Sequence, residues 1–451
     1  MWSRGAPALA LGLLACGAPK TGEDGASGGF LDDSGAADGG AGGADGAGGG
    51  DGVGADGDHC VMLAEARWSE ERVGPVEAHN DAPELVVASD GRLVVLHAVA
   101  GSEGALSIRP AGGGDWRSAA RFGDMNFGGI ELAPDGSLFV ISSNFANLAT
   151  LWAGEPDRLD ALGGPEGMSG GSSQSFAVGP DGVAWAVLTS DFTDVARGRW
   201  TAADGWSTTP LGPVANYAFG VALDVDAAGA PHTSAWVTVG SDWAVMTVDE
   251  AGDESLRYSL GSSTLHDTHI DQAIVTVDGA PQVAIMVGQN DGLLTKGLRA
   301  LRDDPAGELL VSVDDAGYAI ASPVTDGERV EQRYGQVHPL GVTARGGSLV
   351  YVWARVEVVN QLRGDCSGAG EPFPVCAWVI EEQTVNSVVE GACSHEGGAW
   401  TSFTMAEGGQ AWRGRPLLTG AGLYLPLIHA LTDSTGASTG TELRVLLPEG
   451  R

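Results

Sequence analysis

Seven apolar segments of this chain are each preceded by polar side chains that could move a proton or bind a ligand. In a proton-abstraction reaction, His79 or His269 could act as the general base and Tyr217 as the acid. Arg415 could neutralise a substrate carboxylate, such as that of a uronate. The same residue types could also hold a ligand without any reaction. In chain order, the candidate binding residues are His79, Asn80, Asp81, Asn126, Tyr217, His269, Asp271, His338, Arg413 and Arg415.

Other catalytic and metal-binding patterns are weak. The sequence contains no G-x-S-x-G, P-loop or H-E-x-x-H pattern. Asp224, Asp226 and Gly229 have a spacing that faintly resembles a calcium loop, although they also fit an ordinary repeated turn. We expect no other metal and no cofactor. His97 and His232 stand in apolar segments, where a histidine is more often a hydrogen-bonded core residue.

A repeated unit of strand, turn and strand indicates the fold that must position these side chains. "ELVVASDGRLVVLHAV" at 84–99 and "GIELAPDGSLFVISS" at 129–143 are two copies. Asp-Gly suits the tight turn of a hairpin, because glycine readily adopts a positive φ. The first four spacings between turn glycines are 45, 46, 47 and 50 residues, which is typical of four-stranded propeller blades. The turn glycines are Gly91, Gly136, Gly182, Gly229, Gly279, Gly347 and Gly422.

The sequence therefore predicts an all-β fold, with a single β-propeller of seven four-stranded blades at residues 59–451 and six or eight blades as alternatives. Segments that end in a large apolar residue and glycine are predicted as outer strands. The first of them precedes every inner strand, whereas the last blade has only three strands of its own. We expect this first strand to complete the last blade, which would remove two exposed sheet edges. The predicted outer strands are 67–74, 115–123, 205–212, 257–261 and 330–335.

This architecture would bring the candidate residues together. The innermost strand of every blade begins at the same end of the central channel, so the residues before these strands form a ring around one mouth. Polar groups there could simply satisfy exposed backbone and hold water. Histidine, tyrosine and arginine are less expected on that ground, and they favour a binding site.

The repeats also resemble a known class of propeller. "ALDVDAAGAPHTSAW" and "APDGSLFVIS" resemble the BNR-type, sialidase-like repeats of many secreted bacterial proteins. "HNDAPELVVASDGRL" is similar to the first blade of BNR-like polysaccharide lyases, where a His-Asn pair begins an inner strand. The resemblance implies a propeller and raises the possibility of a lyase or glycosidase. The chain lacks true Asp boxes, and a sialidase would need a third arginine beside Arg413 and Arg415.

The N-terminus predicts export and a lipid anchor. Residues 1–16 carry Arg4, an apolar run and the sequence Leu-Leu-Ala-Cys16, which resembles a bacterial lipobox with Cys16 as the acylated residue. The alternative is an ordinary cleaved signal peptide. Residues 17–58 are almost wholly Gly, Ala, Asp and Ser, and we expect a disordered acidic tether. Gly17, rather than an aspartate, follows Cys16, so the outer membrane is the expected location.

The remaining four cysteines predict two disulfides, because an exported protein lies in an oxidising compartment. Four cysteines allow three connectivities. We favour Cys366–Cys376, which would close a short insertion, and Cys60–Cys393, which would tie the closing strand to the ring.

Charge limits the possible partners. The formal net charge is −35, which repels nucleic-acid phosphates and excludes nucleic-acid binding. Two functions remain open. The first is a lipid-anchored envelope protein, expected to be a monomer, whose propeller binds a glycan or a protein. The second is an extracellular polysaccharide lyase or glycosidase.

Overall fold

The structure is a computed structural model, and most of the chain from His59 to Glu449 can be described from it. The signal peptide and tether predicted at 1–58 lie outside the described residues. The described ranges are 59–76, 82–99, 103–125, 127–144, 147–165, 174–190, 194–211, 221–239, 242–261, 270–277, 280–291, 294–302, 307–313, 324–366, 376–408, 411–432 and 438–449.

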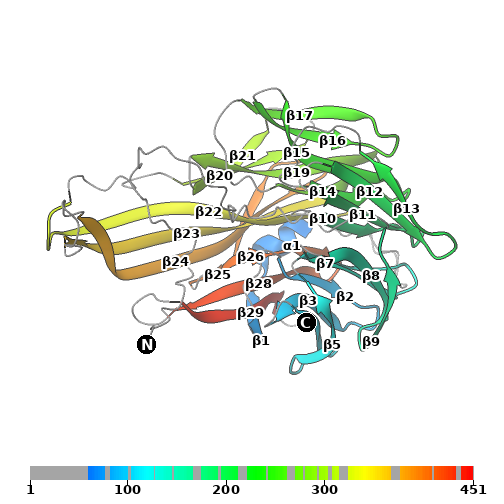
Figure 1. The fold of residues 1–451 in the computed structure, drawn as a ribbon, viewed down its shortest axis with the longest axis horizontal. Coiled ribbons are helices and arrows are strands. Elements are labelled where there is room, and N and C mark those ends of the chain that lie inside the picture. Colours follow the sequence, from blue (N-terminus) through cyan, green and yellow to red (C-terminus); the bar gives the residue numbers. More distant parts are fainter. Residues whose placement is uncertain are drawn as a thin grey trace, which may run out of the picture.

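Seven antiparallel sheets form a ring, which confirms the predicted seven-bladed β-propeller (Figure 1). In six of them the four strands pair in chain order, from the inner strand outward. The first three blades comprise β2 Glu84–Val87, β3 Leu93–Val99, β4 Glu103–Arg109 and β5 Arg117–Asp124; β6 Phe127–Leu132, β7 Leu138–Asn144, β8 Asn147–Glu155 and β9 Arg158–Gly163; and β10 Gln174–Val178, β11 Ala184–Ser190, β12 Asp194–Thr201 and β13 Gly205–Pro210.

The later blades follow the same plan, with a split inner strand in the last one. They comprise β14 Val221–Val225, β15 Pro231–Val239, β16 Asp242–Val248 and β17 Glu254–Gly261; β18 Ile270–Val277, β19 Ala280–Asp291, β20 Leu294–Leu301 and β21 Glu308–Ser312; β22 Arg329–Arg345, β23 Ser348–Asp365, β24 Ala377–His395 and β25 Thr401–Glu407; and β26 Ala411–Gly414, β27 Leu417–Thr419, β28 Gly422–Thr432, β29 Ser438–Pro448 and β1 Trp68–Val76.

The ring closes as the sequence predicts. Strand β1 pairs antiparallel with β29, from Trp68 opposite Pro448 to Val76 opposite Thr441. The first strand of the chain is therefore the outer strand of the last blade. This pairing joins residues near the two ends of the propeller domain and covers the outer edge of β29.

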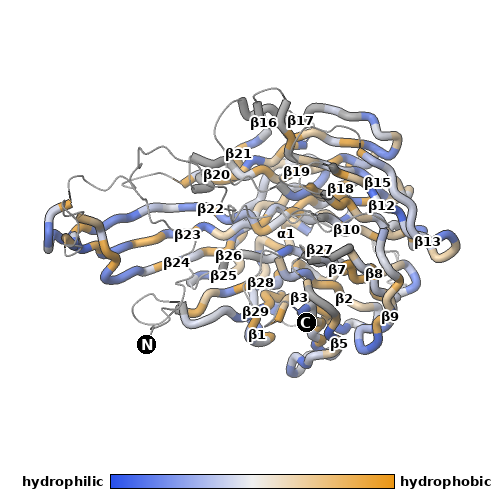
Figure 2. Tube along the Cα trace, in the orientation of Figure 1, coloured by the Kyte–Doolittle hydropathy of each residue, from blue (hydrophilic) through white to orange (hydrophobic). Residues whose placement is uncertain are grey.

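The turns and the core explain why these residues form blades. At the turn between β2 and β3, Gly91 has φ +81° and its N–H donates to Ala88 O at 2.8 Å. Apolar side chains from neighbouring sheets pack together, as Val86 and Val94 of the first blade do with Ile130 of the second. Figure 2 shows these hydrophobic stretches along the strands and hydrophilic residues at several of the outer hairpin ends.

One predicted strand is wrong. Residues 330–335 were expected to form the outer strand of the fifth blade, but they are the first part of β22, the inner strand of the sixth. The outer strand of the fifth blade is β21. The strand runs on through Gly335 to Arg345, because Tyr334 is buried in the core that the sixth blade shares with its neighbour.

The sixth blade is much longer than the others. Strands β22, β23 and β24 have 17, 18 and 19 residues, and they extend far beyond the rest of the ring (Figure 1). We call their protruding parts, residues 329–335, 356–365 and 377–387, the arm. Because β22 enters the ring from the arm, the arm rises from the end of the propeller where the inner strands begin. That end is called the mouth below.

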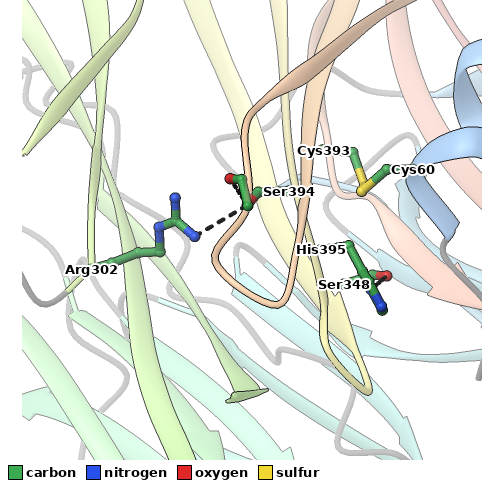
Figure 3. Close-up of a disulfide and its surroundings, with 7 residues drawn as sticks. Cys60, Arg302, Ser348, Cys393, Ser394 and His395 are labelled. Atoms are coloured by element: carbon green, nitrogen blue, oxygen red, sulfur yellow. Dashed lines mark hydrogen bonds between the residues drawn. A yellow bond between two sulfur atoms is a disulfide. The ribbon is translucent and has the colours of Figure 1, made fainter. Parts of the chain in front are cut away.

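Both predicted disulfides are confirmed. Cys366–Cys376 links the ends of β23 and β24 at the tip of the arm. Cys60–Cys393 joins β24 to helix α1, His59–Glu65, as Figure 3 shows. Cys393 lies opposite Val350, close to the hairpin at the far end of the inner strand. Helix α1 therefore sits at the end of the propeller opposite the mouth.

No helix in the described part of the chain is long and apolar enough to cross a membrane. The lipid anchor predicted at Cys16 lies outside these residues, so it stays a prediction.

Candidate functional site

The predicted mouth residues are described only in part. Asp271, His338 and Arg415 are described fully, and the backbone of Arg413 lies in β26. The others lie outside the described residues: His79, Asn80, Asp81, Asn126, Tyr217 and His269. Their places in the site therefore stay predictions.

Arg415 is the centre of a buried ion-pair cluster. It precedes β27 of the seventh blade, and its side chain is 7% exposed. One guanidinium nitrogen donates to the carboxylate of Glu84 from the first blade, and Nη2 lies 3.3 Å from Asp271 Oδ1 of the fifth. The structure thus brings together two of the predicted residues, Arg415 and Asp271, from blades that are far apart in sequence.

Inner-strand side chains also connect neighbouring blades through the backbone. Glu84 Oε2 accepts the N–H of Ile130 at 2.8 Å, and Asp271 Oδ2 accepts that of Val342 at 2.8 Å. Each carboxylate therefore meets both the Arg415 charge and the next inner strand. Similar bonds run from Leu223 N to Ser175 Oγ, from Ile274 N to Asp224 Oδ2 and from Leu418 N to Thr343 Oγ1.

A glycine makes room for this cluster. Gly341 stands at a bulge in β22 with φ +148°, next to the N–H that Asp271 accepts. A Cβ there would lie 2.7 Å from Pro416 Cδ and 2.9 Å from Asp271 Oδ2. Only glycine lets the β22 backbone come this close to Asp271 and to the residue after Arg415.

Burial perturbs the titration of these carboxylates. Desolvation raises the pKa of Glu84, although Arg415 works in the opposite direction. Burial and then the charge of Glu84 raise the pKa of Glu131 well above its usual range. Burial likewise raises the pKa of Asp224. Burial opposes the charge of Arg415, but Glu84 and Asp271 outweigh it and raise the pKa of the guanidinium. The central channel is thus rich in carboxylates around one arginine.

The aspartates of the possible calcium loop, Asp224 and Asp226, make hydrogen bonds to the backbone instead. Asp226 Oδ1 accepts the N–H groups of Ala228 and Ala230, both at 2.9 Å, and so stabilises the repeated turn. Asp224 instead binds the neighbouring inner strand, as described above. Across the described residues, no three His, Cys, Asp or Glu side chains gather in a way that could hold a metal ion.

His338 lies at the mouth beside another polar side chain. Its Nε2 is 2.9 Å from Gln336 Nε2, and Gln336 is buried. The two residues alternate along β22 just before it enters the ring. Their side chains therefore stand together at the base of the arm.

Two Ser–His pairs could suggest nucleophilic catalysis, but they are structural. His97 Nε2 lies 2.9 Å from Ser107 Oγ within the first blade, and burial lowers the pKa of His97 to about 4. This confirms His97 as a hydrogen-bonded core residue. Ser348 Oγ lies 2.9 Å from His395 Nδ1 near the Cys60–Cys393 disulfide (Figure 3). Ser348 is completely buried, so its hydroxyl cannot meet a substrate.

Glu84, Glu131 and the role of Asp224 were not predicted. Glu84 begins an otherwise apolar inner strand, and Glu131 and Asp224 lie within such strands, so an acidic residue in an apolar segment was the available signal. Their partners could not be inferred, because the residues in contact lie on different blades and are 46 to 331 positions apart in the sequence.

Comparisons with known proteins assign the chain to no family. No family model and no curated protein matches the chain. Among solved structures, an ulvan lyase of polysaccharide lyase family PL25, bound to -[GlcA(1-4)Rha3S]-, is 9% identical; the match covers 84% of this chain and 94% of that one, with a TM-score of 0.47. The Aleuria aurantia lectin with Fucalpha1-6GlcNAc is 10% identical, with 71% and 94% covered and a TM-score of 0.39.

A third similar structure is AofleA from Arthrobotrys oligospora. It is 8% identical, the match covers 71% of this chain and 92% of that one, and the TM-score is 0.42. Identities and scores this low do not decide what the present chain binds.

Proposed function

We propose that this protein is a lipid-anchored cell-envelope protein whose propeller binds a glycan or a protein ligand at the mouth. The observation that carries the proposal is a pair of polar side chains at the mouth. His338 stands beside Gln336 on β22, and the buried cluster of Arg415, Glu84 and Asp271 holds that strand in place through Val342. Side chains held in place before a ligand arrives lose little entropy on binding, which favours affinity.

The same geometry favours binding over catalysis. In a lyase, Arg415 would neutralise a carboxylate of the substrate. Two carboxylates of the protein already surround this guanidinium, and a substrate would have to displace one of them. The alternative of a polysaccharide lyase or glycosidase stays open through His79, Tyr217 and His269.

The position of α1 supports an orientation for the anchored protein. Cys16 would carry the lipid, and the tether at 17–58 would lead into α1. Because α1 lies at the end opposite the mouth, the chain from the membrane would arrive at the far end of the propeller. The chain that leads to the membrane would then leave the mouth and the arm uncovered.

A glycan array followed by titration tests the proposed binding site. We would compare the wild type with His79→Ala, His269→Ala and His338→Ala, with Arg117→Ala on an exposed outer strand as the control. Loss of one strong hydrogen-bond partner should weaken binding by about 1–3 kcal/mol, at an unchanged melting temperature. Undiminished binding in all three variants would place the site elsewhere. Release of unsaturated ends from an acidic polysaccharide would instead support the lyase.

A further inference from the structure

The arm presents a long sheet edge that no other described strand covers. Strand β24 pairs with β23 along its whole length, from Asp365 opposite Ala377 to Ser348 opposite His395. On its other side, β25 pairs only with Val388–Cys393. Among the described strands, none pairs with the outer edge of residues 377–386, a length of about 33 Å at 3.3 Å per residue.

The backbone groups that point outward from this edge can be assigned. Ser387 O accepts the N–H of Gly408 at 2.8 Å, so Ser387 points toward the β25 side. In an antiparallel strand, alternate residues point the same way, and the pairing with β23 is regular from 382 to 387. Val385 and Gln383 therefore also direct their N–H and C=O groups to the open edge.

The side chains along the edge divide into two faces. Ile380 lies opposite Leu362, and Gln383 lies opposite Asn360, on the face that continues into the core shared with the seventh blade. A bulge at Gln361 and Leu362 leaves Glu381 as an extra residue and keeps Ile380 on this face. Ile380 is 48% exposed, so an apolar surface stands open beside the edge.

The opposite face of the edge is acidic and polar. Glu382, Thr384 and Asn386 are all exposed there. Strand β24 has three glutamates and no lysine or arginine. Glu381 pairs with Arg329 and Arg363, and Glu390 pairs with Arg355, so Glu382 is the glutamate that would meet an added strand. The edge has a bulge but no lysine or proline, the residues that most often block such edges. It is apolar on one face, and on the other it presents the carboxylate of Glu382.

We propose that the outer edge of β24 at residues 377–386 binds an extended, basic segment of a partner protein as an added strand. The incoming strand would place apolar side chains beside Ile380 and Val385. On the other face, its lysine or arginine side chains would stand beside Glu382. Main-chain bonds to Gln383 and Val385 would supply affinity, and the alternation of apolar and basic residues would supply specificity. A second copy of this chain would fit less well as the added strand, because pairing two β24 edges would bring the glutamates of the two copies together.

Two peptides test this directly on the full disulfide-bonded protein. The first is a ten-residue acetylated and amidated peptide of alternating valine and lysine, and the second has glutamate in place of lysine. We expect the lysine peptide to bind at least tenfold more tightly and to protect the amides of Gln383 and Val385 from hydrogen exchange. Equal binding of both peptides, protection at other strands, or dimerisation through this edge would each overturn the proposal.

A pair of variants isolates the main-chain contribution. Val385→Pro removes an outward N–H without removing a bond to β23, and Val385→Ala makes a comparable loss of packing but keeps the N–H. We expect at least a tenfold loss of lysine-peptide binding for Val385→Pro and less than a threefold loss for Val385→Ala. Similar affinities for the two variants would contradict strand addition. Should Val385→Pro fail to fold, Glu382→Lys serves instead, since it should reverse the preference between the peptides.

Discussion

Replacing Arg415 with methionine should destabilise the propeller strongly and in a pH-dependent way. The variant keeps most of the side-chain volume but leaves Glu84 and Asp271 buried without their shared cation. Removing one partner of a buried ion pair typically costs about 3–5 kcal/mol. An independent bound comes from protonation. The ordinary pKa of Glu84 is 4.5, so keeping it neutral at pH 7.5 costs about 4 kcal/mol, at about 1.4 kcal/mol per pH unit.

The same argument gives the sign of the pH dependence. Loss of Arg415 raises the folded-state pKa of Glu84 further above its unfolded value, so the penalty is full at high pH and disappears as the pH falls toward 4.5. At pH 5 the bound is only about 0.7 kcal/mol for this carboxylate.

Guanidinium unfolding at pH 7.5, 6 and 5 measures this difference. Arg117→Met is the matched control, because its partner Asp157 and Arg117 itself are each 51% exposed. Solvent screens an exposed pair, so its loss should destabilise the propeller far less than loss of the buried cluster. We would abandon the buried-cluster interpretation if Arg415→Met cost no more than the control, or if its cost stayed constant between pH 7.5 and 5.

Three further results are expected. Gly341→Ala should cost about 1–3 kcal/mol in thermal unfolding, because its Cβ meets the contacts described above, whereas Gly440→Ala, with a similar φ of +149° and open space around it, should cost clearly less; equal losses would contradict the close approach. Replacing both Cys60 and Cys393 with alanine should lower stability by about 3–5 kcal/mol in denaturant unfolding, and an unchanged midpoint would argue against a constraining bond. Cys16→Ser should abolish palmitate labelling and partition into detergent, and labelling that persists would reject the anchor.

Local features of the fold were readable from the sequence. Asp-Gly turns at a spacing near 46 residues fix the blade period, and a first strand without inner strands before it implies ring closure. The two disulfides were predicted from the even number of cysteines, the short segment between Cys366 and Cys376, and the expected closing strand. Segment 330–335 was wrongly predicted as an outer strand, because Tyr334 and Gly335 match the large apolar residue and glycine that end the other outer strands. The strand instead continues into the ring.

The contacts within the site were harder to predict from the sequence. Arg415 and Asp271 were predicted near one mouth and do contact each other, but the ion pair depends on the diameter of the closed ring and on the lengths of three different side chains. Glu84 was seen only as part of an apolar strand. The arm was counted as an insertion, because the length of a blade in sequence does not say whether extra residues fold back or continue the strands.

The disulfide between α1 and β24 also determines how the propeller would respond to mechanical load. In the anchored protein proposed here, a pull on the tether enters the domain at His59, one residue before Cys60. The covalent bond passes this force into β24, a strand held on both sides within the sixth blade near Cys393. The seam between β1 and β29 then carries no tension. With the bond reduced, the same pull would reach Trp68 and peel β1 from Pro448 onward, opening the ring at its only seam between distant parts of the described chain.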